Sequence, residues 1–452
     1  MTRNALLLTV VCTTLFFFGF DKPHRDDINP ANALESYLNN GDKSFRWELK
    51  DSFEVGEVTA YNLLLTSQKW RDFTWRHQLT VLVPKENNHD GALLFITGGS
   101  NKDEQPNWST NKGDALAFGL VAARNKAIVA VLRQTPNQPF FNNLTEDALI
   151  SYTLHNFQKD NDYTWPLLFP MVKSAMRGMD AVQAFARQNL NHTVNRFVVS
   201  GASKRGWTTW LTGAVDNRAV AIAPMVIDIL NMPKNLKYQI DSWNKYSEQI
   251  QDYVDLGLTE AMTSPGGRAI TQMIDPYSYR KKLTQPKMIF MGTNDEYWTV
   301  DAIKHYYDDI PGRNLIHYVP NAGHGLGDKR QALEGLSAFF GTTLLKQTYP
   351  VCQWTVSQTR EGVKLTVKTT PELLEEAVVW SADSDDRIFQ DEKWESRSLG
   401  AKNQPAVELV EPFPKSGYKA FYVDLKYKAP NGGTYIQSTR MFLTDNDEVF
   451  LK

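Results

Sequence analysis

The segment around Ser203 has the residue types of a serine presented as a nucleophile. Residues 196–206 read Arg-Phe-Val-Val-Ser-Gly-Ala-Ser-Lys-Arg-Gly, a short apolar strand that runs into a sharp turn at Ser203. A serine hydroxyl is a weak nucleophile at its own pKa, so the turn carries chemistry only if a general base and an orienting carboxylate accompany it. We predict that Ser203 is a nucleophile; the alternative is an ordinary serine N-cap of a helix.

Two later segments supply the carboxylate and the imidazole. The apolar stretch that starts at Pro286 ends in Asp295, and the stretch that starts at Leu315 leads to His324 between two glycines. Each residue follows a predicted parallel strand, and the chain order Ser, Asp, His is that of the α/β-hydrolase triad. In such a triad the histidine takes the serine proton while the carboxylate fixes the histidine tautomer. We predict catalytic roles for Ser203, Asp295 and His324.

Each of these two assignments has a competitor in the sequence. Asp228 follows the preceding predicted strand and competes with Asp295 as the acid. His317 competes with His324 as the base, but it lies in mid-strand among apolar residues, which favours a packed or surface position. Asp295 and His324 are the preferred assignments.

An oxyanion site is expected beside the turn, because a tetrahedral intermediate needs two N–H groups aimed at its developing charge. We assign one to the amide of Lys204 and the other to the loop at Gly98 and Gly99, which is otherwise an ordinary turn signal. The turn departs from the Gly-x-Ser-x-Gly pattern, since Arg205 holds the second glycine position and Gly206 follows it. The side chains of Lys204 and Arg205 are candidates for binding an acidic substrate group; otherwise they are solvated.

Four runs of the sequence carry a family resemblance. They are Gly-Ala-Ser-Lys-Arg-Gly-Trp-Thr-Thr-Trp at 201–210, Pro-Met-Val-Ile-Asp-Ile-Leu-Asn-Met at 224–232, Gly-Thr-Asn-Asp-Glu-Tyr-Trp at 292–298 and Asn-Ala-Gly-His at 321–324. The chain resembles the PhoPQ-activated pathogenicity-related proteins, a family of exported proteins similar to α/β-hydrolases. The resemblance implies that fold and suggests hydrolysis, without implying a substrate.

Strands alternate with helices through the first three quarters of the chain. Alternating polarity predicts antiparallel edge strands over 45–84. Buried parallel strands are predicted at 92–97, 127–132, 196–200, 219–226, 287–291 and 314–319, and helices at 172–188, 205–215 and 300–309. This pattern favours an open, mainly parallel sheet with its site at the carboxyl ends of the strands. Together with the triad order and the family resemblance, it leads us to place an α/β-hydrolase domain over residues 30–347.

Two connections and the C-terminal quarter stand apart from this pattern. The connections 134–170 and 231–284 are longer than a crossover needs and carry many aromatic residues. We expect them to form a cap over the triad; the alternative is that they cover an edge of the sheet.

Short alternating segments over 350–452 predict a separate β-sandwich of immunoglobulin or fibronectin type. We expect this β-sandwich to dock a protein partner, to help the substrate approach the site, or to stabilise the protein.

The N-terminus is predicted to direct export. Arg3 precedes an apolar run from Ala5 to Phe20, so residues 1–20 have the pattern of a signal peptide. No clean cleavage site follows, which leaves an uncleaved membrane anchor as the alternative. The protein is therefore expected to be periplasmic or secreted, or tethered to a membrane. Removal of the signal would take Cys12 with it and leave Cys352 without an intrachain partner.

The composition and motifs of the sequence limit the kinds of partner and cofactor that we expect the protein to bind. A net charge of −2, with both signs interspersed, gives no electrostatic basis for binding nucleic acid. No cluster has metal-ligand spacing and no glycine-rich phosphate loop precedes a helix, so no cofactor or metal is expected. We predict a serine hydrolase, an esterase or a peptidase, that acts on a small-molecule or peptide substrate. The alternative is a catalytically silent binding or signalling protein with the same fold, which the unusual residue Arg205 keeps open.

Overall fold

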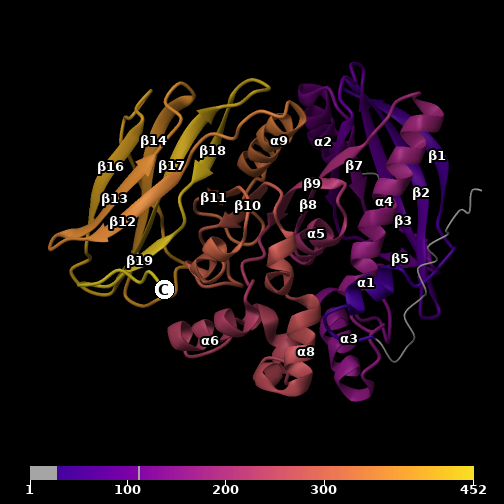
Figure 1. Cartoon of the computed structure of the whole chain (residues 1–452), viewed down its shortest axis with the longest axis horizontal. Helices are drawn as coiled ribbons and strands as arrows, with labels where there is room; N and C mark the ends of the chain where they lie inside the picture. The colour runs from indigo at the N-terminus through magenta and orange to yellow at the C-terminus, as the bar shows by residue number, and fades with distance from the viewer. Residues whose placement is uncertain (1–27, 110–111) are drawn as a thin grey trace, which may run out of the picture.

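The computed structural model describes residues 28–109 and 112–452 and is built around a long mixed β-sheet (Figure 1). Within these residues the sheet has fourteen strands. Its first nine, in spatial order, are β1 (Arg46–Val55), β2 (Val58–Trp70), β3 (Phe73–Pro84), β7 (Val129–Leu132), β4 (Gly91–Ile96), β8 (Arg196–Ala202), β9 (Ala219–Met225), β10 (Lys287–Gly292) and β11 (Asn314–Val319).

The strand directions follow the predicted pattern. Strands β1, β2, β3 and β7 pair antiparallel in succession, and β7, β4, β8, β9, β10 and β11 are parallel. The predicted edge strands and all six predicted parallel strands are confirmed. The order and directions are those of an α/β-hydrolase, with all parallel strands ending at one edge.

Helices cover both faces of this sheet, which is why its strands are apolar on both sides. One face carries α1 (Ala33–Leu38), α4 (Leu168–Asn189) and α5 (Lys204–Val215), and the other carries α2 (Lys112–Asn125) and α9 (Arg330–Leu344). In β8, Val199 belongs to the first core and Val198 to the second. The predicted helices at 172–188 and 205–215 are confirmed as α4 and α5.

The predicted helix at 300–309 is wrong. Two short 3₁₀ helices, η5 (Ala302–His305) and η6 (Tyr307–Asp309), occupy this segment. Tyr306 separates them with φ −147°, which lies far outside the range of an α-helix. Its buried hydroxyl donates a 2.6 Å hydrogen bond to Asp228, so a tertiary contact sets the break.

Most of the helices of the two long connections lie together near the carboxyl ends of β8 to β11 (Figure 1). The first connection contains α3 (Glu146–Asp160). The second contains α6 (Met232–Trp243), η2 (Glu248–Ile250), α7 (Gln251–Val254), η3 (Glu260–Thr263), α8 (Pro265–Ile274) and η4 (Pro276–Lys282). Because α3 contacts both α7 and α8, the two connections pack against each other. A small hairpin, β5 (Asn101–Lys102) and β6 (Gln105–Pro106), follows β4.

The C-terminal quarter is built of β-strands, and one of its sheets continues the central sheet. Strand β11 pairs with β18 (Thr434–Ser438) through Ile316 and Ser438, and β17 (Tyr418–Lys428), β14 (Leu374–Ser384) and β15 (Glu395–Ser398) follow, with β19 (Phe442–Thr444) on β17. A second sheet contains β12 (Gln353–Gln358), β13 (Gly362–Lys368) and β16 (Ala406–Pro412). The immunoglobulin or fibronectin type and the domain boundary stay predictions.

Apolar side chains join the two C-terminal sheets to the rest of the molecule. Leu365 of β13 and Val423 of β17 share one buried cluster with Phe340 of α9 and Leu315 of β11. The core therefore runs from the central sheet into the C-terminal strands without a gap.

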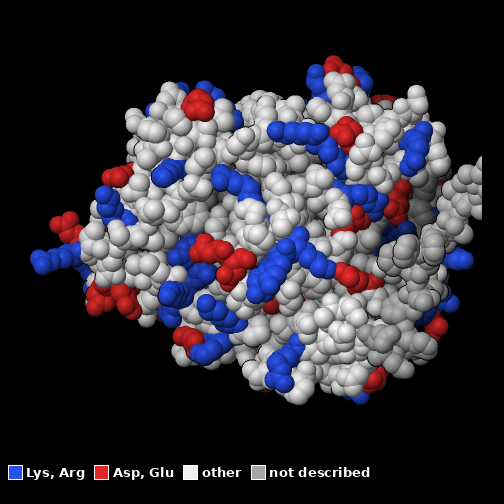
Figure 2. Space-filling view, in the orientation of Figure 1, with Lys and Arg blue, Asp and Glu red and all other residues white. Residues whose placement is uncertain are grey.

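The surface and the termini add three observations. Lysine, arginine, aspartate and glutamate side chains are interspersed over the face shown in Figure 2. Residues 1–20, predicted as a signal peptide or anchor, lie outside the described residues. Among the residues that are described, no helix combines the length and the apolarity needed to cross a bilayer.

Removing the C-terminal strands should unfold the whole chain. Truncation after Tyr349 would expose the edge of β11 and the apolar side of α9, so we expect aggregation instead of a stable monomer. Size-exclusion chromatography and circular dichroism of the truncated protein, compared with the full chain, would show this aggregation and loss of structure. A soluble, cooperatively unfolding monomer would instead establish 350–452 as a separate domain.

Candidate functional site

Ser203 lies in a strained turn between β8 and α5. Its backbone angles, φ 58° and ψ −125°, are rarely adopted by a residue with a side chain and cost on the order of 1–3 kcal/mol. Two glycines allow the close approach: a Cβ on Gly201 would lie 2.9 Å from the Ile96 carbonyl oxygen, and one on Gly206 would lie 2.6 Å from that of Met225. Gly206 thus permits the helix packing, although it is one residue late for the usual pattern.

The turn brings Ser203 to His324 and Asp295. The Ser203 Oγ lies 2.8 Å from His324 Nε2, and His324 Nδ1 lies 3.0 and 2.9 Å from the two carboxylate oxygens of Asp295. Because Nδ1–H faces a carboxylate, Nε2 is left to accept from the serine hydroxyl. The arrangement has the geometry needed for proton transfer from Ser203.

Asp295 and Asp228 have different surroundings. Asp295 accepts a hydrogen bond from the Tyr297 amide, at 2.9 Å, besides its contact with His324. Burial raises the pKa of Asp295, while the hydrogen bond with His324 lowers it. Asp228 accepts a hydrogen bond from the Tyr306 hydroxyl, and burial raises the pKa of Asp228 to about 8. The structure brings Asp295, and not Asp228, to the histidine.

His317 lies elsewhere. It is fully buried in β11, its Nδ1 is 3.0 Å from the Ile436 carbonyl oxygen, and its ring packs against Phe290. Burial lowers the pKa of His317 to about 4, so the ring is neutral at ordinary pH. This histidine is a packed strand residue.

Arg205 is a buried support of the turn. Its guanidinium forms two hydrogen bonds with the Glu146 carboxylate, at 2.8 and 2.7 Å, and Nε donates to the Thr135 carbonyl oxygen. Burial opposes ionisation of Glu146, yet the hydrogen bonds from Arg205 hold its pKa below the ordinary value. The side chain that was a candidate for binding an acidic substrate group is therefore already paired.

The same guanidinium lies directly under the loop predicted to hold the oxyanion. A Cβ built on Gly98 would lie 2.5 Å from Arg205 Nη2, and Gly99 adopts φ 136°. Gln138 continues the contact: its side-chain amide donates both to the Gly99 carbonyl oxygen, at 3.1 Å, and to Glu146, at 2.7 Å. Arg205 thus ties the first long connection to the loop and to the turn.

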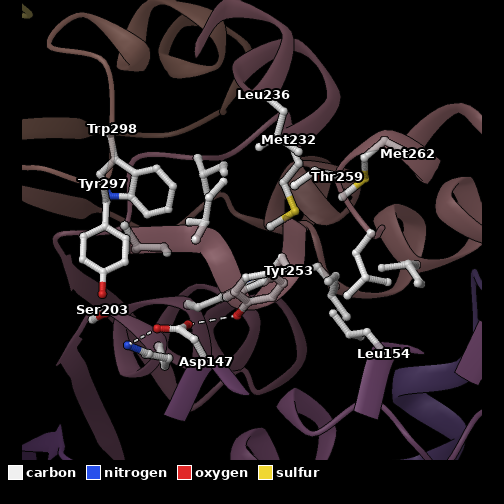
Figure 3. A pocket seen from close by; sticks show the side chains of 18 of the residues that line it. Asp147, Leu154, Ser203, Met232, Leu236, Tyr253, Thr259, Met262, Tyr297 and Trp298 are labelled. Atoms are coloured by element: carbon white, nitrogen blue, oxygen red, sulfur yellow. Dashed lines mark hydrogen bonds and ion pairs between the residues drawn. The ribbon is translucent and has the colours of Figure 1, made fainter. Parts of the chain in front are cut away.

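Tyr297 forms a wall of the site. Its ring stacks on that of His324 at a centroid distance of 4.0 Å, and its hydroxyl points toward Ser203 in Figure 3. Burial and the nearby carboxylates Asp147 and Asp295 raise the pKa of Tyr297 to about 12, so the hydroxyl is a hydrogen-bond donor at neutral pH. This side chain can hold the imidazole in plane and offer a donor to a bound molecule.

Lys204 reaches from the start of α5 to the cap helices. Its ammonium lies 2.6 Å from Asp147 Oδ2, and the Tyr253 hydroxyl donates to Asp147 Oδ1 at 3.0 Å (Figure 3). Asp147 lies in the first turn of α3 and Tyr253 lies on α7, so one carboxylate joins both long connections to the turn at Ser203. Lys204 is paired as well, and only its backbone amide remains a candidate for the oxyanion.

The C-terminal strands support the loops that carry Asp295 and His324. Asn294 donates to the carbonyl oxygens of Phe389, Gln390 and Glu392 in the β14–β15 loop, at 3.2, 3.2 and 2.7 Å.

Asn321, three residues before His324, exchanges two hydrogen bonds with the Trp394 backbone. The C-terminal quarter, which lacks a recognisable catalytic set, therefore helps to position the site.

Several of these residues escaped prediction from sequence. Glu146, Asp147 and Tyr253 lie in the long connections, where no motif or periodicity distinguishes one polar residue from its neighbours. Tyr297 had the better signal, since it stands two residues after Asp295 in the same loop. Within residues 28–109 and 112–452, no three His, Cys, Asp or Glu side chains are grouped to hold a metal ion.

Comparison with known proteins gives a family match over most of the chain. Residues 34–391, which include Ser203, Asp295 and His324, match the family described as PhoPQ-activated pathogenicity-related protein. Autocrine proliferation repressor protein A of Dictyostelium discoideum is 28% identical over 430 residues, which cover 88% of this chain and 86% of that protein.

Solved structures of esterases and hydrolases are similar at lower identity. Acetyl xylan esterase 1 from Thermoanaerobacterium sp. JW/SL YS485 has a TM-score of 0.49 and 18% identity, and the match covers 70% of this chain and 94% of that one. An S-formylglutathione hydrolase from Agrobacterium tumefaciens has a TM-score of 0.45 and 10% identity, with 66% and 99% covered.

Substituting the two buried aspartates should separate their roles. Asp295→Asn should slow the reaction of Ser203 with a fluorophosphonate by a factor approaching about 10,000, because the amide no longer holds the required histidine tautomer. Asp228→Asn should leave that rate within about threefold, because its carboxyl is mostly protonated at pH 7. The rate constants of labelling measure both, and a larger loss in Asp228→Asn would contradict the assignment.

Arg205→Lys should impair reactivity more than folding. Lysine cannot reproduce the forked contact under Gly98, so we expect kcat for an activated ester to fall roughly 10- to 100-fold with little change in KM. Arg218 is the matched control, because it makes a similar two-bond contact with Asp216 at the opposite end of α5. Equal kcat losses in Arg205→Lys and Arg218→Lys would mean that the effect is general destabilisation.

Proposed function

The chain belongs to the PhoPQ-activated pathogenicity-related protein family, and we propose that it is an exported serine hydrolase that cleaves an ester or amide through an acyl-enzyme. The observation that carries this proposal is the continuous hydrogen-bonded path from Ser203 Oγ through His324 to Asp295. The strained backbone of Ser203 at the end of a parallel strand supports it.

Acylation begins with attack of Ser203 Oγ on the carbonyl carbon of the substrate. His324 Nε2 accepts the serine proton, and the Asp295 carboxylate stabilises the imidazolium that forms. When the tetrahedral intermediate collapses, the bond to the leaving group breaks, and the leaving group takes the proton from Nε2. The acyl group is then bonded to Ser203.

The oxyanion of the intermediate is stabilised by backbone amides. The Lys204 amide adjoins Ser203 at the N-terminus of α5, where the helix dipole also favours negative charge. The loop at Gly98 and Gly99, supported by Arg205, supplies the second donor. The Tyr297 hydroxyl faces the same space and is available to a substrate oxygen.

Deacylation reverses the proton path. His324 takes a proton from a water molecule, the hydroxide attacks the acyl carbon, and Ser203 leaves as the alkoxide and regains its proton from Nε2. The products are a carboxylic acid and an alcohol or amine. A capped peptidase would follow the same steps with an amine leaving group.

A second candidate is a catalytically silent binding or signalling protein. The name of the amoebal relative, a repressor of proliferation, favours it, because such an activity needs no turnover. The buried side chain of Arg205, in the place of a small residue, no longer argues for this candidate, since Gly206 provides the packing space.

Export is part of the proposal and rests on the N-terminal sequence and on the family. Arg3 and the apolar run from Ala5 to Phe20 have the pattern of a signal peptide. A periplasmic or secreted location, or a tether through this segment, follows from it.

Stoichiometric labelling of the folded protein by a fluorophosphonate tests the hydrolase. We expect one label per chain on Ser203, lost in Ser203→Ala and in His324→Ala, and a burst of product from an activated ester before steady turnover. Both variants should keep the circular dichroism spectrum of the wild type. Absence of labelling in the folded wild type would favour the silent binding protein.

A further inference from the structure

An apolar cavity opens beside Ser203 and extends under the cap. Its volume is about 70 Å³, and its walls come from both long connections, the loop after β9, the turn at Ser203 and the loop that carries Tyr297. Figure 3 shows Ser203 on one side of this cavity, with Leu154 and Met262 on the far side. Aliphatic and methionine side chains form most of the wall, among them Leu154, Ile227, Ile229, Leu236, Met262 and Ile270.

Most polar groups on the wall are already paired with protein; the Tyr297 hydroxyl, which faces Ser203, and the Trp298 indole N–H are the two exceptions among the lining residues. Asp147 is bonded to both Lys204 and Tyr253, and the Trp207 indole donates to the Ile274 carbonyl oxygen at 2.6 Å. Toward Met262 and Leu154, away from these two donors, a charged or strongly polar substrate group would lose its water without gaining a partner. The cavity therefore selects an uncharged, apolar group.

We propose that this cavity binds the acyl chain of the substrate, and that the enzyme hydrolyses esters of unbranched aliphatic acids of about four to eight carbons. The inference rests on the proposed function, because the chain would be held while its carbonyl carbon is bonded to Ser203 Oγ. A cavity of about 70 Å³ has room for about five water-sized groups, so it favours an acyl chain of short or medium length over a long one.

The position of the cavity relative to Ser203 fixes the direction in which the acyl chain of the substrate lies. Ser203, Lys204 and Tyr297 belong to its wall, so the acyl carbon lies at the polar end and the methyl end of the chain lies toward Met262. The alcohol part of the ester then leaves on the other side of Ser203. Specificity of this site is a matter of acyl length.

The test is a series of p-nitrophenyl esters from acetate to palmitate. Burial of each added methylene should raise kcat/KM by up to about fourfold, with a maximum between butyrate and octanoate and a fall at palmitate. A maximum at acetate, or no dependence on length, would overturn the assignment of the cavity.

A variant that fills the far end of the cavity sharpens the test. Met262→Trp should lower the ratio of kcat/KM for hexanoate to that for acetate at least tenfold. Met176, half-buried on α4 and outside the cavity, is the matched control, and Met176→Trp should leave the ratio as in the wild type. An unchanged ratio in Met262→Trp would contradict the proposal.

Binding without turnover separates this inference from the proposed function. In Ser203→Ala, p-nitrophenyl hexanoate should raise Tm more than p-nitrophenyl acetate at equal concentration, and Met262→Trp in the same background should remove the difference. If fluorophosphonate labelling fails while this difference is present, hydrolysis is refuted and the cavity remains a binding site for an aliphatic chain without turnover. If labelling succeeds and the difference is absent, only the cavity assignment is refuted.

Discussion

The close approach of α5 to the strands at Ser203 is the constraint on which the rest of the site depends. Helix and strand backbones meet within van der Waals distance at Gly201 and Gly206, and this contact forces Ser203 into its unfavourable backbone angles. The packing of the two cores on either side of the sheet over-determines the turn and offsets its strain. The hydroxyl is presented to His324 because of this packing.

Arg205 shows how a buried charge can take over a structural task. A guanidinium at this depth costs desolvation energy unless a carboxylate meets it in good geometry, and Glu146 does so with two hydrogen bonds. The pair joins three segments that are distant in the sequence: the loop at Gly98, the start of α3 and the turn at Ser203. Its value lies in fixing one arrangement of these segments.

The C-terminal strands are part of the same construction. They extend the central sheet at β11 and share its core, and the β14–β15 loop holds Asn294 and Asn321 beside the segments that carry Asp295 and His324. Parallel strands bring loops to one edge of a sheet, yet they do not fix the conformation of those loops. In this chain a later part of the polypeptide does so.

The sequence by itself determined most of the sheet and the candidate catalytic residues Ser203, Asp295 and His324. Apolar periodicity and the polar residues at strand ends are local signals, and the order of the three residues is read directly from the chain. It could not find the break at Tyr306, the pairing of Arg205 with Glu146, the stacking of Tyr297 on His324, or the continuation of the sheet through β18. Each of these depends on a contact between residues far apart in the chain. Only the packed tertiary structure selects such partners, because a buried polar group is tolerated only where another group meets it with a hydrogen bond.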